Sequence, residues 1–255
     1  MIKTDIPTFK GKPIVEVPKY LFLRGDFGKA VLEEYNGRVQ SDYKNNYILR
    51  VLSYNDQSNI VEGSNPFAVV LVNQILSQEG LRTAPQADLE RILKTQALNL
   101  SDHYEDSGIV LRSENDPEYA INDHLARNLN KQIKSRDPKV QYPVMIPLNG
   151  LELQEDSNSE YGLSFILADE TQIIYAPILK KDGRFSSKDI DENTGLPTRT
   201  RSDDGERYLC TKQDGLSGLC LNWGLYLNSH WNYLDDSNSD GRVVVVSDAV
   251  ALKTS

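Results

Sequence analysis

The sequence has few cysteines and shows no export signal. Only two cysteines, Cys210 and Cys220, occur among its 255 residues. Small secreted domains rely on several disulfides, so this number excludes a disulfide-stapled scaffold. The first residues, MIKTDIPTFKGKP, contain no apolar stretch of the kind that a secretory signal needs. We therefore expect two free thiols in a soluble protein of the cytoplasm.

Long hydrophobic runs and excess positive charge are also missing. The longest uncharged, mainly apolar stretch covers residues 63–78. It is shorter than the roughly 20 residues that a membrane-spanning helix needs. Lysine and arginine total 28 against 37 aspartates and glutamates, which gives a net charge of −9. Because an acidic chain repels phosphate groups, we expect neither a membrane nor a nucleic acid as partner.

The sequence lacks the short motifs of several large enzyme classes. It contains no G-x-S-x-G, H-E-x-x-H, Walker phosphate loop or G-x-G-x-x-G. Its histidines, His103, His124 and His230, lie far apart, and none pairs with another at the spacing of one helical turn. No catalytic residue is predicted, so the sequence leaves open whether the protein is an enzyme.

Helical patterns dominate the first part of the chain. Ser64-Asn65-Pro66 predicts the start of an apolar, buried helix that ends at Gly80. Thr83 and Gln86 have the spacing of a capping box, which predicts a second helix to about Lys94. Further helices are predicted over residues 27–36, 43–54 and 117–134, the first of them ending at Gly37.

The second part of the chain changes to the alternation that is typical of strands. Residues 143–154, 161–169 and 171–181 are predicted strands, and Asp182-Gly183 is a predicted hairpin turn. Leucines alternate from Leu219 to Leu227, which predicts one strand with Trp223 in the core. Earlier in the chain, the pattern allows strands at residues 14–17 and 107–113, and later it predicts a fully buried strand over residues 242–246.

This change of pattern predicts an α+β fold. We expect a mainly helical N-terminal half, residues 1–140, to pack on a mostly antiparallel β-sheet formed by residues 141–255. No linker rich in glycine, serine or proline separates the halves. They are therefore either two regions of one composite domain or two domains.

An acidic turn in the second half resembles a calcium-binding loop over part of its length. Asp236, Asn238 and Asp240 supply alternate oxygen ligands, and Gly241 follows where such loops bend. The bidentate glutamate of those loops is missing, because Ser247 stands at its position. Two interpretations stay open: a weak site for calcium or another divalent cation, or a plain hairpin turn without a cofactor. A poorer copy of the pattern covers residues 189–195.

Aromatic residues gather just before this turn. His230, Trp231 and Tyr233 lie in the polar stretch NSHWNYLDDSNSDG, where burial is a poor explanation for two large rings. They are candidates for a surface that binds a protein or a small ligand. The leading hypothesis is therefore a binding or interaction protein. The alternative is a hydrolase that depends on a divalent cation held by the Asp-rich turns.

Overall fold

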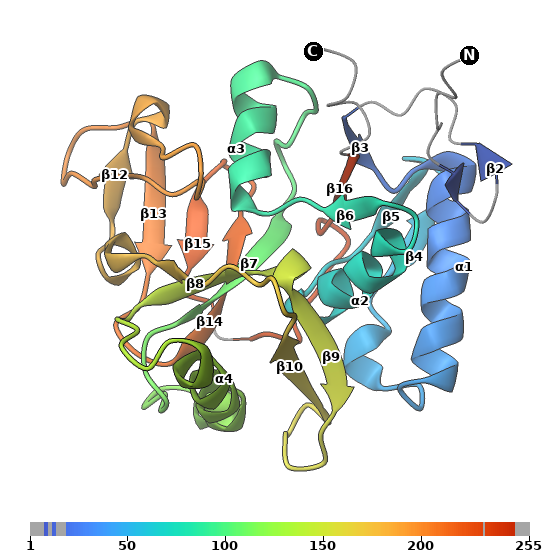
Figure 1. Ribbon diagram of the computed structural model, residues 1–255. Coiled ribbons are helices and arrows are strands. Elements are labelled where there is room, and N and C mark those ends of the chain that lie inside the picture. The colour runs from blue at the N-terminus through green and yellow to red at the C-terminus, as the bar shows by residue number, and fades with distance from the viewer. Residues whose placement is uncertain (1–7, 10–11, 14–18, 232, 248–255) are drawn as a thin grey trace, which may run out of the picture.

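The computed structural model describes residues 8–9, 12–13, 19–231 and 233–247 (Figure 1). The strand predicted at residues 14–17 lies outside these ranges. The described residues form four α-helices: α1 (Gly25–Ser41), α2 (Pro66–Ser77), α3 (Gln86–Thr95) and α4 (Asp123–Arg136). Short 3₁₀ helices occur at Tyr47–Leu49, Ala120–Asn122, Leu148–Gly150, Pro177–Lys180 and Ser187–Asp189.

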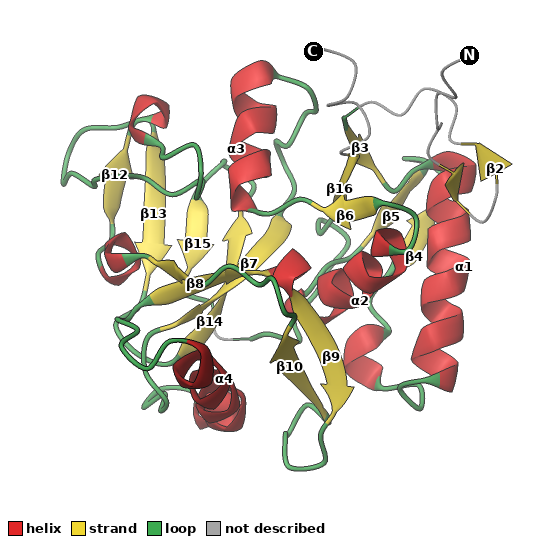
Figure 2. Cartoon of the chain, in the orientation of Figure 1, coloured by secondary structure: helices red, strands yellow, loops and turns green. Residues whose placement is uncertain are grey.

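A curled, seven-stranded sheet forms one side of the molecule (Figure 2). Its neighbouring strands run antiparallel except β13 and β15, which are parallel, so the sheet is mixed. Its strands, in spatial order, are β11 (Ile174–Tyr175), β8 (Val144–Pro147), β7 (Glu105–Leu111), β14 (Leu216–Leu221), β15 (Leu227–Ser229), β13 (Arg207–Thr211) and β12 (Gly183–Phe185).

Smaller sheets complete the described fold. A three-stranded sheet has the order β3 (Tyr20–Phe22), β16 (Val244–Ser247) and β6 (Leu81–Thr83), so that residues from both ends of the described chain pair directly. Three two-stranded sheets join β1 (Thr8–Phe9) to β2 (Lys12–Pro13), β4 (Ser53–Asn55) to β5 (Ile60–Glu62), and β9 (Leu151–Glu155) to β10 (Leu163–Leu167).

The predicted arrangement of a helical half packed on an antiparallel half is wrong. Strands β3 to β7 alternate with helices α1, α2 and α3 along the chain, and the large sheet is mixed. β7, from the first half, lies inside that sheet between β8 and β14 of the second half. Periodicity reports which face of a segment is buried, but strand pairing depends on contacts between segments far apart in sequence.

Several predicted element boundaries are also wrong for local reasons. α1 continues through Gly37 to Ser41, and Gly37 does not adopt the left-handed φ of a C-terminal cap. Residues 43–54 form a 3₁₀ turn and β4 instead of a helix. Asp116 does not open α4: it forms a buried ion pair with Lys212, and the helix begins seven residues later at Asp123. β12 begins at Gly183, where a hairpin turn was predicted.

The predicted buried helix is confirmed as α2. Its N-cap is Asn65, whose side-chain oxygen accepts the backbone N–H of Ala68 at 2.8 Å. The helix contacts α1, β6, β7 and β9, so apolar residues face protein on nearly every side. Its fully or almost fully buried side chains include the six that the sequence pattern predicts: Phe67, Val69, Val70, Leu71, Ile75 and Leu76.

A single buried arginine joins the strands of the large sheet. Arg112 directly follows β7, and its guanidinium donates to the carbonyl of Leu179 and to the hydroxyl of Ser217, at 3.0 and 2.9 Å. It also donates to the hydroxyl of Thr211 at 2.6 Å and to the carbonyl of Ser229 at 3.0 Å. Burial lowers the pKa of Arg112 to about 9. The guanidinium thus contacts residues of β13, β14 and β15 together.

Leu71→Ala is expected to lower the free energy of unfolding by about 2–5 kcal/mol, because it leaves a cavity inside α2's packing. The matched change Leu98→Ala, at a half-buried leucine, is expected to cost less. Urea denaturation followed by circular dichroism measures both. Equal losses for the two variants would show that α2 does not form the centre of the core.

Arg112→Lys is expected to lower the free energy of unfolding by roughly 2–4 kcal/mol, because lysine keeps the charge but cannot make a fork of hydrogen bonds to several strands. The control is Arg199→Lys, whose side chain is exposed and pairs only at the surface with Asp189. That change is expected to stay within about 0.5 kcal/mol of the wild type. Similar urea midpoints for both variants would contradict the role of Arg112.

Candidate binding pocket

A pocket of about 290 Å³ opens beside β7, β14 and β15 and is bordered by the acidic turn. Its small and apolar lining residues are Pro66 at the start of α2, and Gly218 and Cys220 on β14. Aromatic rings, carboxylates and side-chain amides make up the rest of the lining. The volume is at the lower end of the range for ligand sites, which is roughly 300–1,000 Å³, and fits a small molecule.

Trp223 lines this pocket and is 54% exposed, so its predicted place in the core is wrong. β14 ends at Leu221, and a turn follows in which the N–H of Leu225 bonds to the carbonyl of Asn222 at 2.7 Å. Leu225 takes a positive φ of 60° there. Leu219 and Leu221 therefore belong to β14 and Leu227 to β15, whereas Leu225 and Trp223 lie in the turn between them.

Trp231 and Tyr233 line the same pocket, and each is 51% exposed. Their ring centroids are 5.9 Å apart in an edge-to-face arrangement. On its other side Tyr233 meets Tyr119 at 4.8 Å, again edge to face. The backbone N–H of Tyr119 is held by the buried carboxylate of Asp116 at 3.0 Å, so this chain of rings is tied to a rigid turn.

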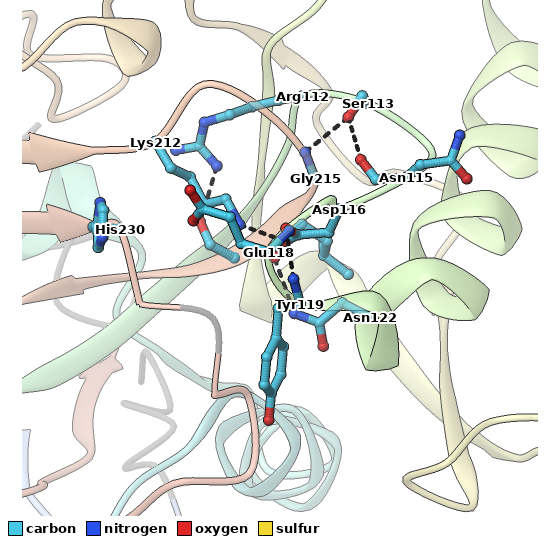
Figure 3. Close-up of polar contacts among 12 residues, drawn as sticks. Arg112, Ser113, Asn115, Asp116, Glu118, Tyr119, Asn122, Lys212, Gly215 and His230 are labelled. Atoms are coloured by element: carbon cyan, nitrogen blue, oxygen red, sulfur yellow. Dashed lines mark hydrogen bonds and ion pairs between the residues drawn. The ribbon is translucent and has the colours of Figure 1, made fainter.

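His230 does not line the pocket, although sequence reasoning grouped it with the neighbouring rings. Its Nδ1 lies 3.0 Å from the carbonyl oxygen of Thr211. Figure 3 shows the His230 ring apart from the dashed contacts around Arg112, Lys212 and Asp116. The His230 ring thus contacts the end of β13, whereas its neighbour Trp231 lines the pocket.

Hydrogen bonds to remote segments shape the acidic turn. The N–H of Ser64 donates to the hydroxyl of Ser237 at 2.9 Å, and the hydroxyl of Tyr104 accepts the N–H of Asn238 at 3.2 Å. Gly241 has no left-handed φ. A Cβ there would come within 2.7 Å of Ser64 and Tyr104, so the glycine permits a close approach of two chain segments rather than a bend.

The three predicted metal ligands do not all line the pocket. Asp236 and Asn238 line the pocket, whereas Asp240 does not. The side-chain oxygen of Asn238 accepts the N–H of Asp240 at 2.9 Å and so serves the turn itself. The poorer copy is similar, because Asp191 accepts the N–H groups of Asn193 and Thr194. In the described part of the chain, no group of three or more His, Cys, Asp or Glu side chains is placed to hold a metal ion.

Asp106 is the lining residue that sequence reasoning missed. It lies on β7, deep in the pocket, and its carboxylate accepts the hydroxyl of Ser64 at 2.6 Å. Burial raises the pKa of Asp106 to about 6, and the negative charge of Asp236 adds to that rise. In the sequence, Asp106 is a charged residue directly before an apolar stretch. The strand predicted there began one residue later, at Ser107, so Asp106 was not placed on it.

The two cysteines lie on strands either side of β15. Cys210 and Cys220 both pair in register with Asn228, one from β13 and one from β14. Two strand spacings separate them, roughly 10 Å, which is too far for a disulfide. Burial raises the pKa of both thiols, most strongly at Cys220 in the pocket lining, so neither is an activated nucleophile.

A second pocket, of about 430 Å³, lies at the start of α3. Arg82 and Arg91 line it, but both form ion pairs with the buried carboxylate of Asp88, at 2.7 and 2.8 Å. Glu170 adds a negative charge to the same lining. These charges are largely engaged with one another, so the first pocket remains the better candidate site.

Comparison with protein-family models, curated proteins and solved structures finds no match to this chain. In the part of the chain that the structure describes, no helix combines the length and apolar composition needed to cross a lipid bilayer.

Asp106→Asn is expected to stabilise the free protein near neutral pH by about 1–3 kcal/mol. An acid whose pKa is raised in the folded state binds its proton more tightly there than in the unfolded chain. Wild-type stability therefore falls as the pH rises from about 4 to about 6, and the asparagine variant escapes this loss.

Urea denaturation between pH 4 and 8 measures the difference between the two proteins. The difference is expected to grow up to about pH 6 and then stay constant. Asp203→Asn, at an exposed position outside the pocket, is the control and is expected to follow the wild type. Parallel curves for wild type and Asp106→Asn would contradict the assignment.

Proposed function

We propose that this chain is a non-enzymatic binding protein whose pocket between β7, β14, β15 and the acidic turn takes a small ligand. The observation that carries the proposal is the presence of Trp223, Trp231 and Tyr233 in one pocket, each about half exposed. Large rings left open to water are costly unless a ligand or partner covers them.

The chemistry of the remaining lining supports binding rather than catalysis. The amides of Asn222, Asn228 and Asn238 supply hydrogen-bonding groups around the rings, as ligand sites require. The hydrolase alternative needs a metal or a histidine beside the carboxylates. His230 bonds instead to Thr211, and Asn238 bonds within its own turn, so neither supports that alternative.

We further propose that the protein acts in the cytoplasm and does not bind nucleic acids. Two thiols that are held apart across β15 suit a reducing compartment. The pocket presents the carboxylates of Asp106 and Asp236, which repel phosphate groups.

The experiment is ligand-observed NMR with a panel of neutral, anionic and cationic fragments, repeated on Trp231→Ala. We expect some fragments to bind the wild type and to lose about tenfold or more in affinity to the variant, because a buried aromatic contact is worth about 1–2 kcal/mol. Because the ring is half exposed, the melting temperature is expected to change little.

Tyr175→Ala is the matched control. Tyr175 is an aromatic residue on β11 that is 53% exposed and does not line the pocket. Fragment binding is expected to survive this change. Absence of any bound fragment, or equal losses in the Trp231 and Tyr175 variants, would overturn the proposed function.

A further inference from the structure

The charge in the pocket has one sign. Asp106 and Asp236 supply carboxylates, the other polar side chains of the lining are neutral, and no described lysine, arginine or histidine lines the pocket. Asp106 feels the negative charge of Asp236, and its hydrogen-bond partner is a neutral hydroxyl, that of Ser64. A ligand that enters the pocket therefore meets uncompensated negative charge.

Asp106, which is partly buried at the pocket, differs from the fully buried acids of the described residues. Each of the buried acids has a basic partner: Asp88 pairs with Arg82 and Arg91, Glu90 with Arg207, Glu105 with Arg242, and Asp116 with Lys212. Removing a carboxylate from water is expensive unless an opposite charge accompanies it. At Asp106 the described residues supply no such charge.

Two of the internal ion pairs show how this chain neutralises a buried carboxylate that lies near an aromatic ring. Arg207 lies 4.9 Å from the ring centre of Phe185 and makes two hydrogen bonds to Glu90. Arg242 lies 4.4 Å from the ring centre of Phe22 and bonds to Glu105. In both places a cation lies between an aromatic face and a carboxylate.

The pocket has the aromatic faces and the carboxylate of that arrangement but not the cation. Trp223 and Trp231 are exposed within it, and tryptophan is the ring that attracts cations most strongly. A neutral sugar would also contact the rings, but it would leave the charge of Asp106 uncompensated. A cation with apolar substituents satisfies both parts of the lining.

We propose that the pocket binds a small organic cation of the substituted ammonium class, with its charge facing Asp106 and Asp236 and its apolar groups against Trp223 and Trp231. This inference rests on the proposed binding function and specifies the class of ligand. The bound cation takes the place that Arg207 and Arg242 hold in the two internal pairs.

The test compares ligands of the same shape and different charge. Choline and benzyltrimethylammonium are the cationic probes, 3,3-dimethylbutan-1-ol is the neutral isostere of choline, and glucose is the neutral polyol. Titration is followed by tryptophan fluorescence and calorimetry at pH 7.5. Choline is expected to bind at least about tenfold more tightly than its isostere, because the two differ only in the charge that the rings and carboxylates recognise.

Two variants test whether the preference for choline depends on the carboxylate of Asp106 in the pocket. Asp106→Asn is expected to weaken binding of choline about tenfold or more while leaving the weak binding of the neutral isostere unchanged. Asp203→Asn removes the same charge from an exposed position outside the lining and is expected to leave both affinities unchanged. This pair separates a local contact from the net charge of the chain.

Three other results would overturn the preference for cations, although the pocket could still bind a different ligand. Equal affinity for choline and its isostere, or tighter binding of glucose, would show a ligand pocket without preference for cations. No binding of either cation up to about 10 mM would also overturn the inference. In all these cases, the fragment panel with Trp231→Ala decides separately whether the pocket binds ligands.

Discussion

The guanidinium of Arg112 is the contact on which the large sheet and the pocket both depend. It joins the end of β7 to β13, β14 and β15 by hydrogen bonds from a single buried side chain. Those strands converge where the sheet curls, and a backbone ladder alone cannot join β7 to β13 across two intervening strands. The bond to the carbonyl of Ser229 fixes the end of β15, and Trp231 leaves the sheet two residues later. The position of Trp231 in the pocket therefore depends on the buried guanidinium of Arg112.

Local patterns predicted the elements that carry their own signal. Ser64-Asn65-Pro66 combines a capping side chain with a proline at the first helical position, and α2 begins there as expected. The valine run of β16 is buried on both faces because Val245 packs into one apolar cluster, and Val244 and Val246 pack into another. Predictions failed where a distant partner decides the structure. Asp116 looks like a helix start, and its carboxylate does accept the N–H groups of Glu118 and Tyr119, but it also forms a buried ion pair with Lys212, and α4 begins only at Asp123.

The site was predictable in part. Trp231, Tyr233, Asp236 and Asn238 stood out because large rings and alternating acids are unusual in a short polar stretch, and the structure places all four around one pocket. Asp106 had no such signal, since one acid beside a strand has many ordinary explanations. Its importance depends on which side chains surround it in space. The fully buried acids Asp88, Glu90, Glu105 and Asp116 have basic partners, whereas Asp106 has a hydroxyl, and this difference is a property of the folded chain alone. A carboxylate that weakens the fold is a common mark of a site selected for binding.

The central position of β16 has a consequence for the order in which the protein assembles. β16 is the last of the described strands along the chain, yet it separates β3 from β6 and provides the hydrogen bonds of both. The acidic turn that borders the pocket leads directly into this strand. During synthesis the ribosome releases β3, α2 and β6 long before β16, so a nascent chain exposes two strand edges and an unfinished pocket until residues 244–247 insert. The acidic turn and β16 are therefore made late and together, and a chain cut before Val244 lacks the strand with which β3 and β6 both pair.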